Sequence, residues 1–288
     1  MIDVAVIGCG PAGLSAAINI YARNKTVIVF GNDFSSCALY KAKKINNHLG
    51  MPNTNGKDLL DRFLAHAKSL DIQIKNGRVT QIMSMKDYFA INFENEIFQA
   101  KAIVLAIGIC KTKKIPGEEK FLGNGVSYCA TCDGMFYKNK SVIVIADNSK
   151  AEDDVKFLSQ ICKNVSYLPK YDLHSAFDSN VEIISGKAKE IVGDSFVNAL
   201  MVDDKRIDCD GVFIINESVP SDNLIFGLET DGSFIKVNRL CQTNLAGVFA
   251  AGDCTGWPFQ LSKAIGDGLV AAQSAVKFVD AIDKGVEK

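Results

Sequence analysis

The stretch VIGCGPAGLSAAINI, residues 6–20, decides the architecture of the first part of this 288-residue chain. It places Gly8, Gly10 and Gly13 in a GxGxxG pattern between an apolar strand and the start of a helix. In a Rossmann unit these glycines permit the tight turn, the approach of a pyrophosphate and close helix–strand packing, in that order. The N-terminus of the helix then faces the negative charge. An ordinary glycine-rich turn would need the flanking strand and helix to be coincidence, so the sequence predicts a dinucleotide-binding domain.

Strands and helices alternate around this loop, as in a doubly wound sheet. In the first part we expect strands at 2–7, 26–30, 72–75, 79–84, 88–93 and 102–107, and helices from Pro11 and at 57–69. The middle part repeats the pattern, with strands expected at 141–145, 165–168, 181–184, 189–192, 197–202 and 211–215 and a helix at 151–161.

The last part of the chain completes the first domain. GSFIKVN is expected to be extended, GVFAAGD is typical of a strand that ends in a tight turn, and QLSKAIGDGLVAAQSAVKFVDAI predicts a long amphipathic helix. We therefore predict an α/β protein with two Rossmann-like domains, the second inserted into the first. The nucleotide-binding domain comprises residues 1–112 and 214–288, and the inserted domain comprises residues 113–213.

Composition excludes several classes of partner. Lys plus Arg number 32 against 33 Asp plus Glu, so no overall field favours nucleic acid or a membrane surface. The first strand begins at Ile2, which leaves no room for a cleaved signal. The apolar runs are too short to span a bilayer. We expect a cytoplasmic protein without nucleic-acid or membrane partners.

Cys129 and Cys132 stand apart from the other cysteines of this chain, because they form a CxxC followed directly by Asp133. Such a pair can close a small disulfide ring, and a neighbouring carboxyl can exchange protons with the thiols. A zinc site needs two more ligands, and neither a second CxxC nor a pair among the three histidines supplies them. The pattern favours redox use over a chance spacing, and no metal is expected. The other seven cysteines are scattered, and most of them are expected to be reduced and buried, where they act as small hydrophobic residues.

The acidic residue that usually contacts the adenosine ribose is missing from its expected place. The second strand, VIVFGND, ends in Phe30 and Gly31. Asn32 or Asp33 could take the role, or both could be exposed turn residues. The sequence leaves this contact open.

The motifs GCGPAG, CATCDGMFY and GVFAAGDC occur in an order and spacing that resemble the low-molecular-weight flavin thioredoxin reductases. The resemblance covers essentially the whole chain. It implies FAD on the outer domain, a redox-active disulfide on the inserted domain and a homodimer. It also implies that Cys132 faces the flavin, Cys129 attacks the partner's disulfide and Asp133 handles protons.

The same resemblance implies a set of cofactor contacts. Asp253 would lie beside the FAD ribityl and pyrophosphate, and the start of the last helix would lie near the flavin ring, where its N-terminus stabilises the anionic reduced form. The chain has SSCAL where the family commonly has a glycine–glutamine pair, so that contact is open. The full set of expected contacts is Gly8, Gly10, Pro11, Ala12, Gly13, Asn47, Gly252, Asp253, Gln260 and Leu261.

The inserted domain lacks the glycines that would hold a pyridine nucleotide. Its strand at 141–145 is followed by ADNSKA in place of GxGxxA, and SYLPKYD supplies only Lys170 where the family has a basic cluster. Asp147, Asp153 and Asp154 add like charge. One like charge at about 4 Å costs roughly 1 kcal/mol in water and about 4 kcal/mol near a protein surface. We expect NADPH not to be the donor, although an unusual loop could still bind NADH weakly.

Without a pyridine nucleotide, the resemblance is greatest to ferredoxin-dependent flavin thioredoxin reductases. Electron flow from a ferredoxin near about −400 mV to a thioredoxin near about −270 mV releases roughly 6 kcal/mol for two electrons. The lysine clusters KAKK (Lys41, Lys43, Lys44) and KTKK (Lys111, Lys113, Lys114) could bind an acidic ferredoxin, although each cluster taken singly is better explained as an ordinary solvated loop. We predict electron transfer from ferredoxin through FAD and the disulfide to thioredoxin, with the inserted domain rotating on connections near 110–114 and 213–218.

Two alternatives stay open at this point. A related disulfide reductase could take electrons from NAD(P)H, a deazaflavin or another flavin, or could act on a different disulfide. A flavin-bearing redox sensor without turnover is a second alternative, which the retained Cys129, Cys132 and Asp133 disfavour.

Overall fold

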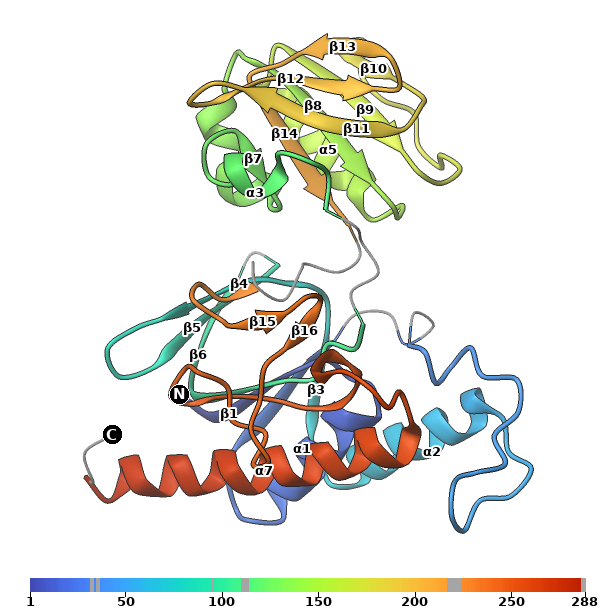
Figure 1. The fold of residues 1–288 in the computed structure, drawn as a ribbon, viewed down its shortest axis with the longest axis vertical. Coiled ribbons are helices and arrows are strands. Elements are labelled where there is room, and N and C mark those ends of the chain that lie inside the picture. Colours follow the sequence, from blue (N-terminus) through green and yellow to red (C-terminus); the bar gives the residue numbers. More distant parts are fainter. Residues whose placement is uncertain (32–33, 35–36, 95, 110–113, 217–223, 286–288) are drawn as a thin grey trace. The chain divides into compact units, whose positions relative to one another are not determined.

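The chain folds into two compact units (Figure 1). The computed structural model describes residues 1–31, 34, 37–94, 96–109, 114–216 and 224–285. The first unit comprises Met1–Cys110 and Pro220–Lys288, and the second is the continuous segment Lys111–Val219 between them. Each unit contains a sheet built mainly from parallel strands, so the predicted α/β class with an inserted second Rossmann-like unit is confirmed.

The first unit is built on a seven-stranded sheet with the order β3-β2-β1-β6-β5-β4, in which β17 pairs with the far end of β6. Its elements are β1 (Ile2–Ile7), α1 (Pro11–Tyr21), β2 (Val27–Gly31), α2 (Gly56–Ser69), β3 (Gln73–Asn76), β4 (Val79–Ser84), β5 (Phe89–Phe93), β6 (Glu96–Leu105), β15 (Thr230–Asp231), β16 (Phe234–Ile235), β17 (Val248–Ala250), η3 (Gly252–Thr255) and α7 (Leu261–Asp283).

Strand β6 is longer than the sequence predicts. The expected strand at 102–107 covers only its buried second half, which pairs in parallel with β1 and β17. The first half, from Glu96, pairs antiparallel with β5 and keeps several exposed side chains. The buried-strand pattern therefore missed this half, because it follows a different periodicity.

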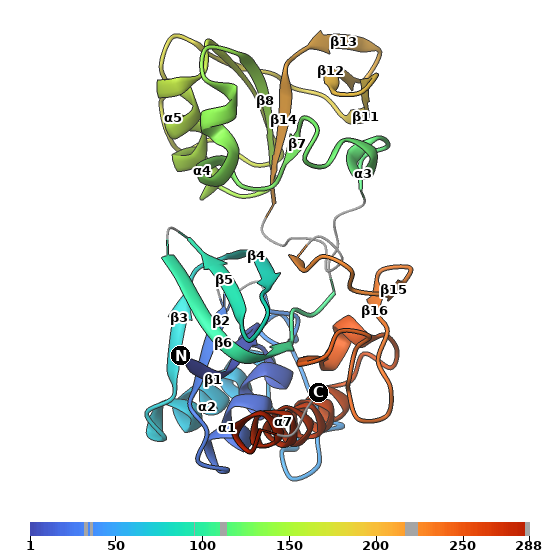
Figure 2. The ribbon, with the colours of Figure 1, turned by 90° about the vertical axis from the view of Figure 1, so that its left-hand side faces the viewer.

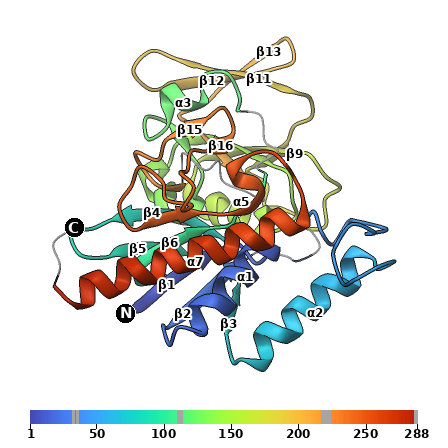
Figure 3. The same cartoon turned by 60° about the horizontal axis from the view of Figure 1, so that its bottom comes forward.

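Alternate side chains of the central strands pack on opposite faces of the sheet. Val4 and Val6 of β1 pack in one core with α1, α2 and α7, and α1 lies between the other two helices (Figures 1 and 3). Ala5 and Ile7 face a second core formed with β4, β5 and residues 224–235. Because both faces are covered, β1 is a continuous apolar run, as expected for a parallel strand.

The second unit has a five-stranded sheet with the order β10-β9-β8-β14-β7 and a separate antiparallel sheet, β11-β12-β13. Its elements are α3 (Glu118–Phe121), β7 (Val126–Ser127), α4 (Ala130–Asp133), η2 (Gly134–Tyr137), β8 (Ser141–Ala146), α5 (Ala151–Ile161), β9 (Asn164–Pro169), β10 (Val181–Ile183), β11 (Ala188–Gly193), β12 (Val197–Val202), β13 (Lys205–Asp208) and β14 (Gly211–Ile215).

Three layers make up this second unit. Helices α4 and α5 lie on one face of the five-stranded sheet, and the antiparallel sheet lies on the other (Figure 2). Strand β14 pairs along its whole length with β8, so its residues 214 and 215 also belong to this sheet. Within the described residues, no helix is long and apolar enough to cross a membrane.

Candidate functional site: a nucleotide cradle and a disulfide

The glycine loop joins β1 to α1, and its three glycines have different surroundings. Gly8 has a φ of +115°, and a Cβ there would lie 2.2 Å from the carbonyl oxygen of Ala106. A Cβ on Gly13 would lie 1.9 Å from the carbonyl oxygen of Gly8. A Cβ on Gly10, in contrast, would contact only the Cys37 sulfur, at 3.5 Å. Gly8 and Gly13 therefore serve the fold, and Gly10 leaves open space above the loop.

The N-terminus of α1 faces this space without a capping side chain. Gly10 is the N-cap, Pro11 is at the first helical position, and the first turn holds no acidic residue. The first N–H groups of a helix have no partner within the helix, and they favour an anion. The loop thus fits the pyrophosphate of a dinucleotide by its open space and by its donors.

The Gly252–Asp253 turn lies directly against the glycine loop. A Cβ on Gly252, whose φ is +83°, would lie 2.8 Å from the Cβ of Ala12. The close packing of α7 on α1 makes this possible, since a Cβ on Gly268 would lie 2.3 Å from the carbonyl oxygen of Ala12. The structure therefore brings together two predicted cofactor motifs that are about 240 residues apart in the sequence, as the doubly wound topology requires.

Two residues that the sequence analysis did not identify hold this turn in place. Lys263 donates to the carbonyl oxygen of Gly252 at 2.9 Å and to Thr255 Oγ1 at 2.8 Å, and it pairs with Asp267 at 2.9 Å. Asp267 also accepts from the Gly252 N–H at 3.1 Å. Burial raises the pKa of Asp253 above its usual value. The positive charge of Lys263 opposes this effect, and the negative charge of Asp267 adds to it. The i,i+4 spacing of Lys263 and Asp267 on α7 was the available signal.

Asn47 and Gln260 are also brought together. Asn47 Nδ2 donates to Gln260 Oε1 at 2.9 Å, and His48 Nδ1 lies 3.4 Å from Ser262 Oγ. Gln260 is the N-cap of α7 and Leu261 its first residue, and the first turn of α7 holds no acidic residue. The loop that carries Asn47 therefore lies beside the uncapped start of the last helix.

The two residues considered for the adenosine ribose follow the end of β2. Asn32 and Asp33 lie outside the described residues, as do Ser35 and Ser36 of SSCAL. Gly31 ends β2 where a Cβ would lie 2.3 Å from the Cys9 sulfur, so its lack of a side chain is explained by packing.

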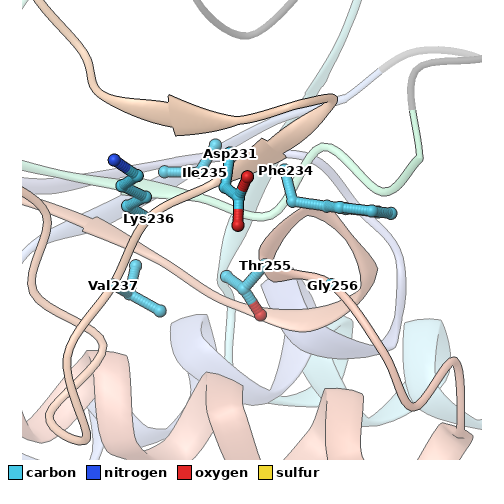
Figure 4. Close-up of a pocket in the computed structure, with 7 residues that line it drawn as sticks. All are labelled: Asp231, Phe234, Ile235, Lys236, Val237, Thr255 and Gly256. Atoms are coloured by element: carbon cyan, nitrogen blue, oxygen red, sulfur yellow. The ribbon is translucent and has the colours of Figure 1, made fainter.

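A hollow of about 430 Å³ adjoins the end of η3 (Figure 4). It is lined by Asp231, Phe234, Ile235, Lys236, Val237, Thr255 and Gly256. It shares Thr255 with the lysine network, but it contains none of the predicted cofactor residues. The candidate cradle is therefore defined by the glycine loop and not by this hollow.

In the second unit, Cys129 and Cys132 form a disulfide at the start of α4. Cys129 is the half-buried N-cap, and its sulfur accepts from the Cys132 N–H at 3.2 Å. Cys132 is exposed, and Asp133 follows it with its carboxylate Oδ2 2.7 Å from the hydroxyl of Ser127. After reduction, the Cys132 N–H would stabilise a thiolate on Cys129, which suits Cys129 as the attacking sulfur.

The remaining described cysteines are free, as expected. Cys9, Cys162, Cys209, Cys241 and Cys254 are buried, Cys37 is half-buried, and Cys110 lies outside the described residues. Burial raises the pKa of the Cys162 thiol to about 11 and that of the Cys254 thiol to about 12. Such thiols are unreactive near neutrality.

The turn between β8 and α5 differs from the glycine loop at the same place in the first unit. Lys150 N donates to Asn148 Oδ1 at 3.1 Å, and Glu152 N donates to the carbonyl oxygen of Ser149 at 3.0 Å. The first turn of α5 carries Glu152, Asp153 and Asp154. Backbone donors that would bind a phosphate are used inside the turn, and negative charge surrounds it.

Glu152 is the central residue of this altered region, and the sequence analysis missed it. Its side chain is only 4% exposed, and Oε1 accepts from the His174 N–H at 2.9 Å and from Tyr171 at 3.2 Å. Burial raises the pKa of Glu152, but hydrogen bonds from Ser175, His174 and Tyr171 outweigh it and lower the pKa. The segment after β9 is thereby folded onto the start of α5, and no sequence motif indicates such a contact.

Comparison with known proteins agrees with this geometry. The model of the pyridine nucleotide-disulphide oxidoreductase family matches residues 2–146 and 170–268.

The chain belongs to this family.

The unmatched residues 147–169 hold the altered turn, α5 and the whole of β9. The two stretches of the family match include the glycine loop, the CxxC and the Gly252–Asp253 turn. Among solved structures, the chain is 42% identical to a ferredoxin-flavin thioredoxin reductase of Clostridium acetobutylicum, with a TM-score of 0.88 over 98% of both chains. It is 28% identical to a thioredoxin reductase of Gloeobacter violaceus, with a TM-score of 0.76 over 100% of this chain and 95% of that one. Among curated proteins, it is 29% identical to the thioredoxin reductase of Listeria monocytogenes over 99% of this chain and 96% of that one.

Membership of the pyridine nucleotide-disulphide oxidoreductase family makes the chain a flavin-dependent disulfide oxidoreductase with FAD as its cofactor. The predicted resemblance to low-molecular-weight thioredoxin reductases is likewise confirmed.

Proposed function

We propose that this protein is an FAD-dependent thioredoxin reductase that receives electrons from reduced ferredoxin. The first unit binds FAD, which supplies the chemistry that joins a one-electron donor to a two-electron disulfide. The Cys129–Cys132 disulfide in the second unit is reduced next and then reduces thioredoxin. The observation that carries the proposal is the pairing of an intact glycine loop in the first unit with an altered turn in the second.

The assignment of FAD to the first unit rests on the cradle. Gly10 leaves room for the pyrophosphate, the Gly252–Asp253 turn adjoins it, and Asn47 and Gln260 lie at the uncapped start of α7. Together with Gly8, Pro11, Ala12, Gly13 and Leu261, these residues are the proposed cofactor contacts.

The exclusion of NADPH as donor rests on the altered turn. Its helix N-terminus has three acidic residues in the first turn, and Glu152 is buried against the segment after β9. A pyrophosphate placed there would meet like charge, which costs about 1–4 kcal/mol per contact at about 4 Å. The binding of NADPH should therefore be weaker by roughly 10-fold to 1000-fold for each such contact.

The proposed docking surface for ferredoxin is the lysine loop, defined as Lys41, Lys43 and Lys44 with the residues up to Gly56. Residues 38–57 contain four lysines and no acidic residue, and the three lysines named are exposed. The loop is closed by backbone hydrogen bonds from Ile45 to Thr54 and from Gly56 to Ala42, both at 2.7 Å. It reaches the start of α7 through Asn47, so an acidic donor bound here would lie beside the proposed flavin site. Of KTKK, Lys111 and Lys113 lie outside the described residues.

The disulfide must meet the flavin in one step and thioredoxin in another. We therefore propose that the second unit rotates about its two connections to the first. The connections expected near 110–114 and 213–218 fall largely outside the described residues. We propose a homodimer in the cytoplasm, as the resemblance implies, with thioredoxin and ferredoxin as partners.

An anaerobic comparison of donors tests the proposal. The purified flavoprotein is mixed in a stopped-flow instrument with reduced ferredoxin, NADPH, NADH or a reduced deazaflavin, and flavin bleaching is followed at its visible absorption band. Reduced ferredoxin should bleach the flavin within seconds and support thioredoxin reduction, and the pyridine nucleotides should do neither. Rapid bleaching by NADPH with none by ferredoxin would refute the donor assignment. Failure to reduce thioredoxin with any active donor would favour a different disulfide substrate or a sensor.

A further inference from the structure

Ser127 is a buried polar residue that none of the expected roles accounts for. It ends the two-residue strand β7, where it pairs in register with Phe213 of β14. Its exposed fraction is 3%, and it lies two residues before Cys129 in the sequence. The sheet therefore fixes the backbone of Ser127 two residues before the disulfide.

The hydroxyl of Ser127 joins the acid–base residue to the attacking cysteine. It donates to Asp133 Oδ2 at 2.7 Å and accepts from the Cys129 N–H at 3.1 Å. The carbonyl oxygen of Cys129 lies 3.2 Å away and is a second possible acceptor. A serine hydroxyl has a single proton, so it can donate to only one of these acceptors at a time.

We propose that Ser127 is a positioning residue for proton transfer at the Cys129–Cys132 disulfide, because its hydroxyl holds the Asp133 carboxylate in place. When Asp133 is ionised, the Ser127 proton points to its carboxylate. When Asp133 is protonated, its O–H donates to Ser127, and the serine proton turns to the Cys129 carbonyl. The protonation state of Asp133 is thereby coupled to the backbone of Cys129.

This inference rests on the proposed disulfide chemistry but not on the electron donor. In exchange with an external dithiol, the S–S bond between Cys129 and Cys132 breaks as the dithiol closes into its own disulfide. The two protons that the dithiol loses are gained by the two cysteine sulfurs. Asp133 carries one of them, and the Ser127 hydroxyl determines where its carboxylate stands while it does so.

Other ionisable groups face the same site and set the background for its pH dependence. Asp133, Cys209 and Asp210 act electrostatically on Tyr137 of η2, and the Lys140 ammonium lies 5.6 Å from the centre of its ring. Burial, followed by the charge of Asp133, raises the pKa of Tyr137, so the phenol stays neutral near pH 7. Asp133 is the carboxylate that the Ser127 hydroxyl contacts.

The test is single-turnover exchange of the oxidised flavoprotein with dithiothreitol and with reduced thioredoxin between about pH 5 and 9. Reactions are quenched with an alkylating reagent and the labelled cysteines are counted by mass spectrometry. Ser127→Ala should slow exchange about 10-fold, a part of the roughly 10²–10⁴-fold that a positioned acid–base group provides. The thioredoxin concentration for half-maximal rate should stay unchanged. The acid limb of the rate profile should move to higher pH, because the ionised carboxylate loses a donor.

Ser127→Thr keeps the hydroxyl and should restore most of the rate. Ser159→Ala is the matched control, since Ser159 is a buried serine of the same unit that bonds to Lys156 O and Asp178 at 2.7 and 2.8 Å. The proposal is overturned if Ser127→Ala exchanges like the wild type at every pH, if Ser159→Ala slows exchange equally, or if the threonine variant is as slow as the alanine variant. If the alanine variant does not fold, Ser127→Gly replaces it, and a wild-type rate in that variant overturns the proposal.

The two reductants separate this inference from the proposed function. A wild-type protein that exchanges with dithiothreitol but not with thioredoxin removes thioredoxin as substrate, and the dithiothreitol series still decides the role of Ser127. A wild-type disulfide that exchanges with neither overturns both.

Discussion

Replacing Gly10 with alanine should separate cofactor binding from folding. Gly10 has φ −76° and ψ −175°, which any residue adopts, and its new Cβ would meet only the Cys37 sulfur at 3.5 Å. We expect the unfolding free energy of the apoprotein to change by no more than about 1 kcal/mol, because the poorer N-capping of alanine is offset in part by the conformational entropy that it removes from the unfolded chain. The added methyl would occupy the space through which the pyrophosphate approaches the helix N-terminus.

The expected loss of FAD affinity follows from the displaced phosphate contacts. Hydrogen bonds to a charged group contribute about 1.5–3 kcal/mol each, so losing two costs about 3–6 kcal/mol. The Kd should therefore rise on the order of 10²-fold or more. Flavin fluorescence during titration of the apoprotein measures the Kd, and the thermal unfolding of the apoprotein measures stability.

Gly13→Ala is the contrasting variant. Its Cβ would lie 1.9 Å from the carbonyl oxygen of Gly8, so the backbone of the loop must move. Overpacking of this kind costs about 1–3 kcal/mol, and the apoprotein itself should be destabilised. A Gly10→Ala protein that binds FAD as tightly as the wild type would refute the cradle, and so would equal destabilisation of the two apoproteins.

Three further results are expected. Reversing the three charges of the lysine loop to glutamate should lower the second-order rate constant for reduced ferredoxin by about 10-fold to 100-fold at low salt, and the effect should shrink as salt rises. As a matched control, the same reversal of the exposed Lys68, Lys86 and Lys277 elsewhere in the first unit should change this rate constant little. Glu152→Gln should lower the unfolding free energy of the second unit by about 1–3 kcal/mol, because its buried hydrogen-bond partners lose a charged acceptor. The same variant should still show no NADPH binding in a calorimetric titration. Lys101→Met should lower the unfolding free energy by about 1 kcal/mol at pH 7. Hydrogen bonds from Lys101 help to hold the pKa of Asp3 and of Asp283 below the ordinary 3.8, against the effect of burial. That stability is present above the ordinary value and is lost as pH falls below it, so urea melts of variant and wild type should converge below about pH 4.

Much of the fold followed from local patterns. The glycine loop, the apolar run of β1 and the long amphipathic α7 each follow one periodicity throughout, and the structure confirms all three. Strand β6 was only half predicted, because its two halves pair differently and only the second is buried on both faces. The short β15–β16 hairpin replaced a longer expected extended segment at GSFIKVN, since only Phe234 and Ile235 of that stretch pair.

The site divides in the same way. Cys129, Cys132 and Asp133 are adjacent in the chain, so their grouping needed no fold to be noticed. Glu152 and its partners are about 20 residues apart, and the network of Lys263 includes Gly252 through a backbone carbonyl, so neither produces a sequence motif. Ser127 likewise acts through a hydroxyl whose partners depend on how β7 pairs with β14.

The sequence by itself determined that this protein has two Rossmann-like units, a glycine loop for a dinucleotide in the first, and a cysteine pair without a glycine loop in the second. Those features depend on residues close together in the chain, where steric and hydrogen-bonding rules act locally. Only the tertiary structure decided that the Gly252–Asp253 turn lies against Ala12, that Glu152 is buried under the segment after β9, and that Ser127 joins Asp133 to Cys129. The physical reason is that each of these contacts joins segments whose separation in space is set by strand order and helix packing, and not by their distance along the chain.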